Sequence, residues 1–122
     1  MGSRSRRRAR RGRQTPAAPP TTTDYRDDEG NVLTLRDSLS EGTLRKLADL
    51  DAKPAASAED RRQRRVEFLF ERLAVRWEIA GLPLEGQKSL LGRYRMASSG
   101  ERRLVRKALV EHLAAKHPEI DL

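Results

Sequence analysis

A run of apolar residues spaced by three and four positions, between residues 57 and 83, constrains the fold of this chain most strongly. Ser57 and Asp60 resemble the start of a capped helix, and Gly81 followed by Pro83 is typical of a helix end. Between these signals, a helical projection gathers six apolar residues within an arc of about 100°, namely Val66, Leu69, Phe70, Leu73, Trp77 and Ala80. Such an arc is typical of a helix face packed on a core, so the pattern predicts one long helix over 58–80.

The same projection gives this helix a second, narrower apolar strip formed by Phe68, Val75 and Ile79. A helix in a small monomer usually needs only one buried stripe, so this strip is a candidate interface with a protein partner or a second copy of the chain. The alternative is that neighbouring elements cover the strip and make it part of the core, which we favour because a central helix in a small domain can be packed on two sides.

Three further helices are predicted from apolar spacing and capping residues, over 38–53, 84–97 and 98–117. Ser38 or Ser40 caps the first, and Ser98 with Glu101 forms a capping-box pattern at the start of the last. Before these helices, a turn cluster over 28–31 separates Tyr25 from an alternating segment, which predicts a β-hairpin. The predicted fold is therefore mainly α: a small four-helix domain over 24–122 with an N-terminal β-hairpin.

Positive charge is concentrated at the N-terminus. The net charge is +8, but residues 1–23 hold seven of the 26 basic residues and no acidic residue, which leaves 19 basic against 18 acidic residues in the remainder. The seven are Arg4, Arg6, Arg7, Arg8, Arg10, Arg11 and Arg13. With three prolines and no large apolar residue after Met1, the segment is predicted to be a disordered basic tail followed by a Pro/Thr linker.

A block of guanidinium groups can neutralise phosphates and release counterions, so the tail is a candidate for non-specific binding to nucleic acid or another polyanion. The alternative is a solubilising or expression-derived leader. Arg61 and Arg65 are weaker candidates for the same role. They lie in the first two turns of a predicted helix, where the helix dipole disfavours cations, and a cluster placed against the local electrostatics suggests an acidic partner such as nucleic acid. Their alternative is a solvated face on which Glu67 and Glu71 pair with the arginines.

Several classes of function are disfavoured by what the sequence lacks. There is no cysteine, so disulfides, thiolate metal sites and cysteine nucleophiles are excluded. His112 and His117 are five residues apart and cannot converge on one metal from a single helix; His112 is expected to be a hydrogen-bonded core or interface residue. No phosphate loop, dinucleotide fingerprint or nucleophile elbow occurs. We therefore expect no catalytic site, no metal and no cofactor.

No segment approaches the roughly 18 consecutive apolar residues of a membrane span, and no apolar region that would form a secretory signal follows the basic residues. We therefore expect no membrane association and a cytoplasmic location.

The stretch LFERLAVRWEIAGLPLEGQKSLLGRYRMAS, followed by ERRLVRKALVEHLAAKHPEI, resembles a family of small uncharacterised proteins of high-GC bacteria, across most of residues 24–122. This resemblance implies no established activity. The order of a hairpin ending in LTLR, a helix, and a long helix carrying Trp77 and the AGLPL turn is similar to phage tail-assembly chaperones. That resemblance implies a small, mostly helical protein that binds an elongated tape-measure protein, although the basic tail is not part of its pattern.

Together these features predict a non-enzymatic binding or adaptor protein whose basic tail contacts nucleic acid without sequence specificity. The alternative is a protein-protein interaction module of the tail-assembly chaperone type.

Overall fold

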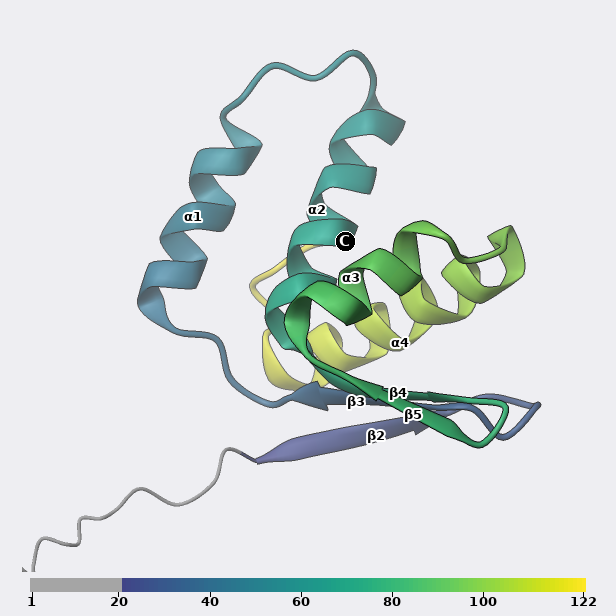
Figure 1. Ribbon diagram of the computed structural model, residues 1–122. Coiled ribbons are helices and arrows are strands. Elements are labelled where there is room, and N and C mark those ends of the chain that lie inside the picture. Colours follow the sequence, from purple (N-terminus) through teal and green to yellow (C-terminus); the bar gives the residue numbers. More distant parts are fainter. Residues whose placement is uncertain (1–20) are drawn as a thin grey trace, which may run out of the picture.

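A computed structural model describes residues 21–122, which combine four helices with one four-stranded antiparallel sheet. The elements are β2 (Thr22–Arg26), β3 (Val32–Arg36), α1 (Glu41–Asp51), α2 (Ala58–Leu73), β4 (Ala74–Ile79), β5 (Leu82–Glu85), α3 (Gln87–Arg95) and α4 (Ser99–Lys116). The strand order is β2-β3-β4-β5. All four of these helices lie on one side of the sheet, and within residues 21–122 no helix covers its other face (Figure 1). Of the disordered tail and linker predicted over 1–23, residues 1–20, with the seven arginines, lie outside the described residues, whereas Thr22 and Thr23 are part of strand β2 and pair with β3, so the linker ends earlier than predicted.

The prediction of a mainly α fold is wrong, because the long helix expected over 58–80 ends at Leu73 and the chain continues as strand β4. The segment AVRWEI alternates Val75, Trp77 and Ile79 with polar residues, and β-branched and aromatic residues in alternation favour a strand. Helix-like spacing continues from Leu73 to Trp77, so the two periodicities overlap at the point where the structure changes.

The residues interpreted as a helix stop form a tight turn between β4 and β5 instead. Ile79 pairs with Leu82, which leaves Ala80 and Gly81 as a two-residue loop, and both have positive φ (53° and 79°). Positive φ at both central residues is required by the type I′ turn, whose backbone twist matches the twist of the flanking strands. Pro83 then lies in β5, an edge strand, where a missing N–H is tolerated. Because residues 82–85 belong to this strand, the third helix begins at Gln87 rather than at residue 84.

Helix starts follow their capping residues closely. Ser57 accepts a hydrogen bond from the backbone N–H of Asp60, so α2 begins at Ala58 as predicted. Ser40 accepts from Thr43, so α1 begins at Glu41. At α4 both halves of the capping box are present between Ser98 and Glu101, so that helix begins at Ser99.

The core lies between the sheet and the helices, with Phe70 of α2 near its centre. The Phe70 ring stacks on Tyr94 of α3, with centroids 5.0 Å apart, and meets Trp77 of β4 edge to face at 5.7 Å. Four residues of the predicted α2 face, Val66, Leu69, Phe70 and Leu73, have no exposed surface. Leu33 and Leu35 of β3 supply the sheet side of the core.

Candidate functional site: a groove between the first hairpin and helix α4

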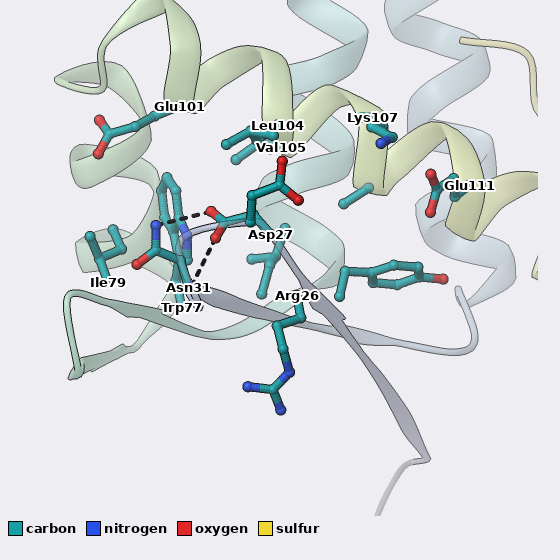
Figure 2. Close-up of a pocket in the computed structure, with 14 residues that line it drawn as sticks. Arg26, Asp27, Asn31, Trp77, Ile79, Glu101, Leu104, Val105, Lys107 and Glu111 are labelled. Carbon is teal, nitrogen blue, oxygen red and sulfur yellow. Dashed lines mark hydrogen bonds between the residues drawn. The ribbon is translucent and has the colours of Figure 1, made fainter.

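A groove opens where the turn end of the β2-β3 hairpin faces the N-terminal half of α4 (Figure 2). Its volume is about 130 Å³. We call it the hairpin-α4 groove; its lining residues are Tyr25, Arg26, Asp27, Asp28, Asn31, Leu33, Trp77, Ile79, Glu101, Leu104, Val105, Lys107, Ala108 and Glu111.

The apolar part of the groove is formed by the sheet on one side and α4 on the other. Tyr25, Leu33 and Trp77 are cross-strand neighbours in one row that faces the helices. Opposite them lies Leu104 of α4, whose side chain is 42% exposed although helical periodicity places it among core residues. An apolar side chain this open to solvent, facing the only tryptophan of the chain, indicates a surface that can gain contacts on binding.

Arg93 holds Trp77 in place from α3. Its guanidinium carbon lies 5.4 Å from the centroid of a Trp77 ring, a cation-π distance. The same guanidinium donates to Oε2 of Glu101 at 2.8 Å. Trp77 is only 5% exposed, so the indole is a largely buried wall whose accessible edge faces the groove.

The polar groups at the hairpin end are already satisfied within the protein. Oδ1 of Asp27 accepts from the backbone N–H of Glu29 at 2.8 Å and of Asn31 at 2.9 Å, and Oδ2 accepts from Nδ2 of Asn31. Oδ1 of Asn31 in turn accepts from the backbone N–H of Ala80 at 2.9 Å. Asp27 and Asn31 therefore join the two hairpins and shape the groove.

Glu101 is likewise committed to structure. Its Oε1 accepts from the backbone N–H of Ser98 at 2.9 Å, while Oε2 accepts from Arg93. The hydrogen bond from Arg93, followed by that from Ser98, lowers the pKa of Glu101 below its usual value. A carboxylate held ionised in this way is a poor proton acceptor near neutral pH.

The free charges of the groove are at its rim. Asp28, Lys107 and Glu111 are exposed, and none of them forms an ion pair with another residue of 21–122. Arg26 also borders the groove, but its side chain extends away from α4 (Figure 2).

His112 lies directly behind the groove and has no exposed surface. Its Nε2 is 2.6 Å from the backbone carbonyl oxygen of Arg36, and its Nδ1 is 2.8 Å from the Tyr25 hydroxyl. A carbonyl oxygen only accepts, so Nε2 carries the hydrogen and the Tyr25 hydroxyl donates to Nδ1. The prediction that His112 is a hydrogen-bonded core residue is confirmed.

The Tyr25-His112 hydrogen bond also involves a titratable hydroxyl. Burial, followed by the negative charges of Glu111 and Asp37, raises the pKa of Tyr25 above its usual value. A phenol with a raised pKa stays protonated at neutral pH, so the Tyr25 hydroxyl keeps the proton that it donates to His112 and links β2 to α4.

The other predicted site residues are dispersed over the structure. Arg61 is exposed in the first turn of α2, whereas Arg65 is half-buried, forms an ion pair with Asp51 of α1 and donates to the backbone carbonyl of Asp121. Arg65 therefore links α2 to α1 and to the C-terminal segment, and a nucleic-acid contact by either arginine stays a prediction.

The apolar strip expected along one helix does not form, because Val75 and Ile79 lie on β4 while Phe68 lies on α2. Phe68 packs partly against the core beneath the Arg72 guanidinium, 5.1 Å from the ring centroid. Val75 is half-buried where the β3-β4 register shifts. Of the three residues, Ile79 is the one that lines the groove.

Comparison with protein-family models, with curated proteins and with solved structures gives no match. Within residues 21–122, no three His, Asp or Glu side chains are grouped so that they could hold a metal ion. In the same range, every helix is too short or too polar to span a lipid bilayer.

Proposed function

We propose that this chain is a non-enzymatic binding protein that holds a segment of another polypeptide in the hairpin-α4 groove. The observation that carries the proposal is the exposed Leu104 facing the Trp77 wall. The hydrogen-bonding groups of Asp27 and Asn31 beside them are already paired, so a partner gains contact area there without having to displace internal bonds.

The size of the groove supports a polypeptide segment over a cofactor. Pockets for drug-sized ligands and cofactors usually measure roughly 300 Å³ or more, whereas this one measures about 130 Å³. The titratable groups beside it also suit binding, because Glu101 is held ionised and the Tyr25 hydroxyl is held protonated. Cytoplasmic location remains a prediction from the sequence.

A second candidate function, polyanion binding, is favoured by the segregation of charge. Seven arginines in residues 4–13 supply nearly all of the net charge of +8. In the folded body, Tyr25 and Trp77 face the helices, so the open face of the sheet carries neither ring as a platform for base stacking. Contact with nucleic acid would then rest on phosphate neutralisation by the basic segment, and the chain would act as an adaptor between a polyanion and a polypeptide.

The groove function is tested by selecting phage-displayed random peptides on the full chain, with two variants of α4 for comparison. Leu104→Glu introduces a charge in the groove, while Val110→Glu makes the same change at a valine of similar exposure, 44%, that does not line it. Selected peptides should bind the wild type and Val110→Glu alike, and Leu104→Glu at least tenfold more weakly. If no peptide is enriched, or if enriched peptides bind all three proteins equally, the groove is not a binding site.

A further inference from the structure

The charges around the hairpin-α4 groove select among polypeptide partners. Asp27, Asp28 and Glu111 are acidic and make no ion pair within residues 21–122, while two basic residues border the groove, Lys107 on α4 and Arg26, whose side chain extends away from α4 (Figure 2). Residues 21–122 as a whole are nearly neutral, with 19 basic and 18 acidic residues. The rim is therefore more acidic than the body that carries it, and this local field favours a cation.

We infer that the groove takes a short extended polypeptide segment in which one large apolar side chain is flanked by lysine or arginine. This inference rests on the proposed function and specifies the partner that the groove accepts. The apolar side chain contacts Trp77 and Leu104, and the flanking cations lie beside Asp28 and Glu111.

The volume sets the number of apolar side chains. An apolar cavity of roughly 150 Å³ in another protein binds one benzene molecule, and the groove measures about 130 Å³. It therefore holds one leucine- or phenylalanine-sized side chain. Tyr25, Leu33 and Trp77 on the sheet and Leu104 on α4 provide apolar contact on two sides.

The length of the groove sets the spacing of the cations. Glu101 and Glu111, at its two ends along α4, are ten residues apart, which corresponds to about 15 Å on a helix. An extended chain covers that distance in about four to five residues. A cation one or two residues from the apolar side chain therefore reaches an acidic rim residue.

The same charges disfavour nucleic acid in this groove, because phosphates would face Asp28 and Glu111. A stacked base is the alternative occupant of the Trp77 wall, and the experiment includes it as an outcome. Binding of a polyanion by the basic segment is a separate matter, since it does not involve the groove.

The test uses the emission of Trp77, which reports on the groove because the chain has no other tryptophan. Three blocked pentapeptides, Gly-Arg-Leu-Arg-Gly, Gly-Glu-Leu-Glu-Gly and Gly-Arg-Ser-Arg-Gly, are titrated into the full chain at low salt, together with a twelve-nucleotide polyuridine strand. We expect a saturable change in Trp77 emission with the first peptide and at least tenfold weaker binding of the other two. Polyuridine should cause no change in Trp77 emission that depends on Leu104, so its effect should be the same in the wild type and in Leu104→Glu.

Two single-charge variants separate a local effect from the overall charge. Glu111→Gln removes a rim charge, and Asp49→Asn removes an exposed acid on α1 that does not line the groove. Glu111→Gln should weaken the Arg-Leu-Arg peptide about threefold, and Asp49→Asn should leave it unchanged.

The outcomes distinguish this inference from the function on which it rests. If phage-selected peptides bind in the groove but lack basic residues, or if the acidic peptide binds as well as the basic one, the inference is wrong and the proposed function stands. If neither the phage-selected peptides nor the three pentapeptides alter Trp77 emission, or if polyuridine alone alters it through the groove, both are wrong.

Discussion

The Tyr25 hydroxyl donates a hydrogen bond to Nδ1 of His112 across 87 residues of sequence, at 2.8 Å, and thereby fastens edge strand β2 to helix α4. The rings also meet edge to face, with centroids 5.5 Å apart. Tyr25 lines the groove and His112 anchors it from α4, so the position of the hairpin relative to α4 depends on this pair.

Removing the Tyr25 hydroxyl should therefore destabilise the fold. Tyr25→Phe keeps the ring contact but leaves Nδ1 of a fully buried histidine without a donor, which costs about 1–3 kcal/mol. Urea unfolding measures the loss. Thr34→Val, which deletes an exposed hydroxyl bonded to Asp24, is the control and should change stability by less than about 0.5 kcal/mol. Equal effects of the two variants would mean that the Tyr25-His112 bond does not secure the hairpin.

The effect of Ala80→Gly on stability should distinguish the β4-β5 turn from a continuous helix, because the two structures predict changes of opposite sign. Ala80 has φ of 53°, a region that costs a residue with a Cβ about 1 kcal/mol, so Ala80→Gly should stabilise the protein or leave it unchanged. If residue 80 lay inside a helix over 58–80, the same change would destabilise by about 1 kcal/mol. Thermal and urea unfolding of the two proteins decide between these signs.

Acid should weaken the junction between α3 and α4. The pKa of Glu101 is lowered in the folded state by Arg93 and Ser98, so its contribution to stability is present above the ordinary glutamate pKa and is lost as pH falls through the lower, folded value. Glu101→Gln keeps a side chain that can accept the capping hydrogen bond but cannot titrate. Unfolding followed from pH 7 to pH 3 should show a smaller loss of stability in Glu101→Gln than in the wild type; parallel curves would contradict this role.

Polyanion binding should depend on the arginines in residues 4–13. With up to seven phosphate contacts to single-stranded nucleic acid, the logarithm of the binding constant should fall with the logarithm of salt concentration with a slope of up to about −5. Deletion of residues 1–13 should abolish retention of the protein on immobilised nucleic acid at low salt. It should leave the unfolding midpoint of residues 21–122 unchanged. Retention that survives the deletion would assign binding to the folded body instead.

Local signals in the sequence predicted the starts of α2 and α4 well. Ser57 and Ser98 each act within one turn of their own position, so the beginnings of α2 and α4 do not depend on distant contacts. The burial of His112 was also predictable, because helical periodicity alone places it on the apolar face of α4.

The end of α2 was not predictable in the same way. Trp77 follows Leu73 by four positions, which suits a helix, and it also alternates with Val75 and Ile79, which suits a strand. The pairing of Trp77 with Leu33 on β3 and with Leu84 on β5 selects the strand over the helix. Leu33 is distant in sequence and Leu84 lies beyond a turn, so neither contact is visible in the local pattern. The groove was not predicted for a related reason. Helical periodicity assigns Leu104 to the core face of α4, and only the position of the sheet shows that it borders a groove.

Partner binding between the first hairpin and α4 can be tested residue by residue. The most direct measurement is a map of amide and indole N–H chemical shifts of the full chain as a groove-selected peptide is added. The largest changes should occur at the Trp77 indole and at the amides of Asn31, Leu104 and Ala108, and Leu104→Glu should remove them. Changes centred on α1 or on the open face of the sheet, with the Trp77 indole unmoved, would contradict binding in the hairpin-α4 groove.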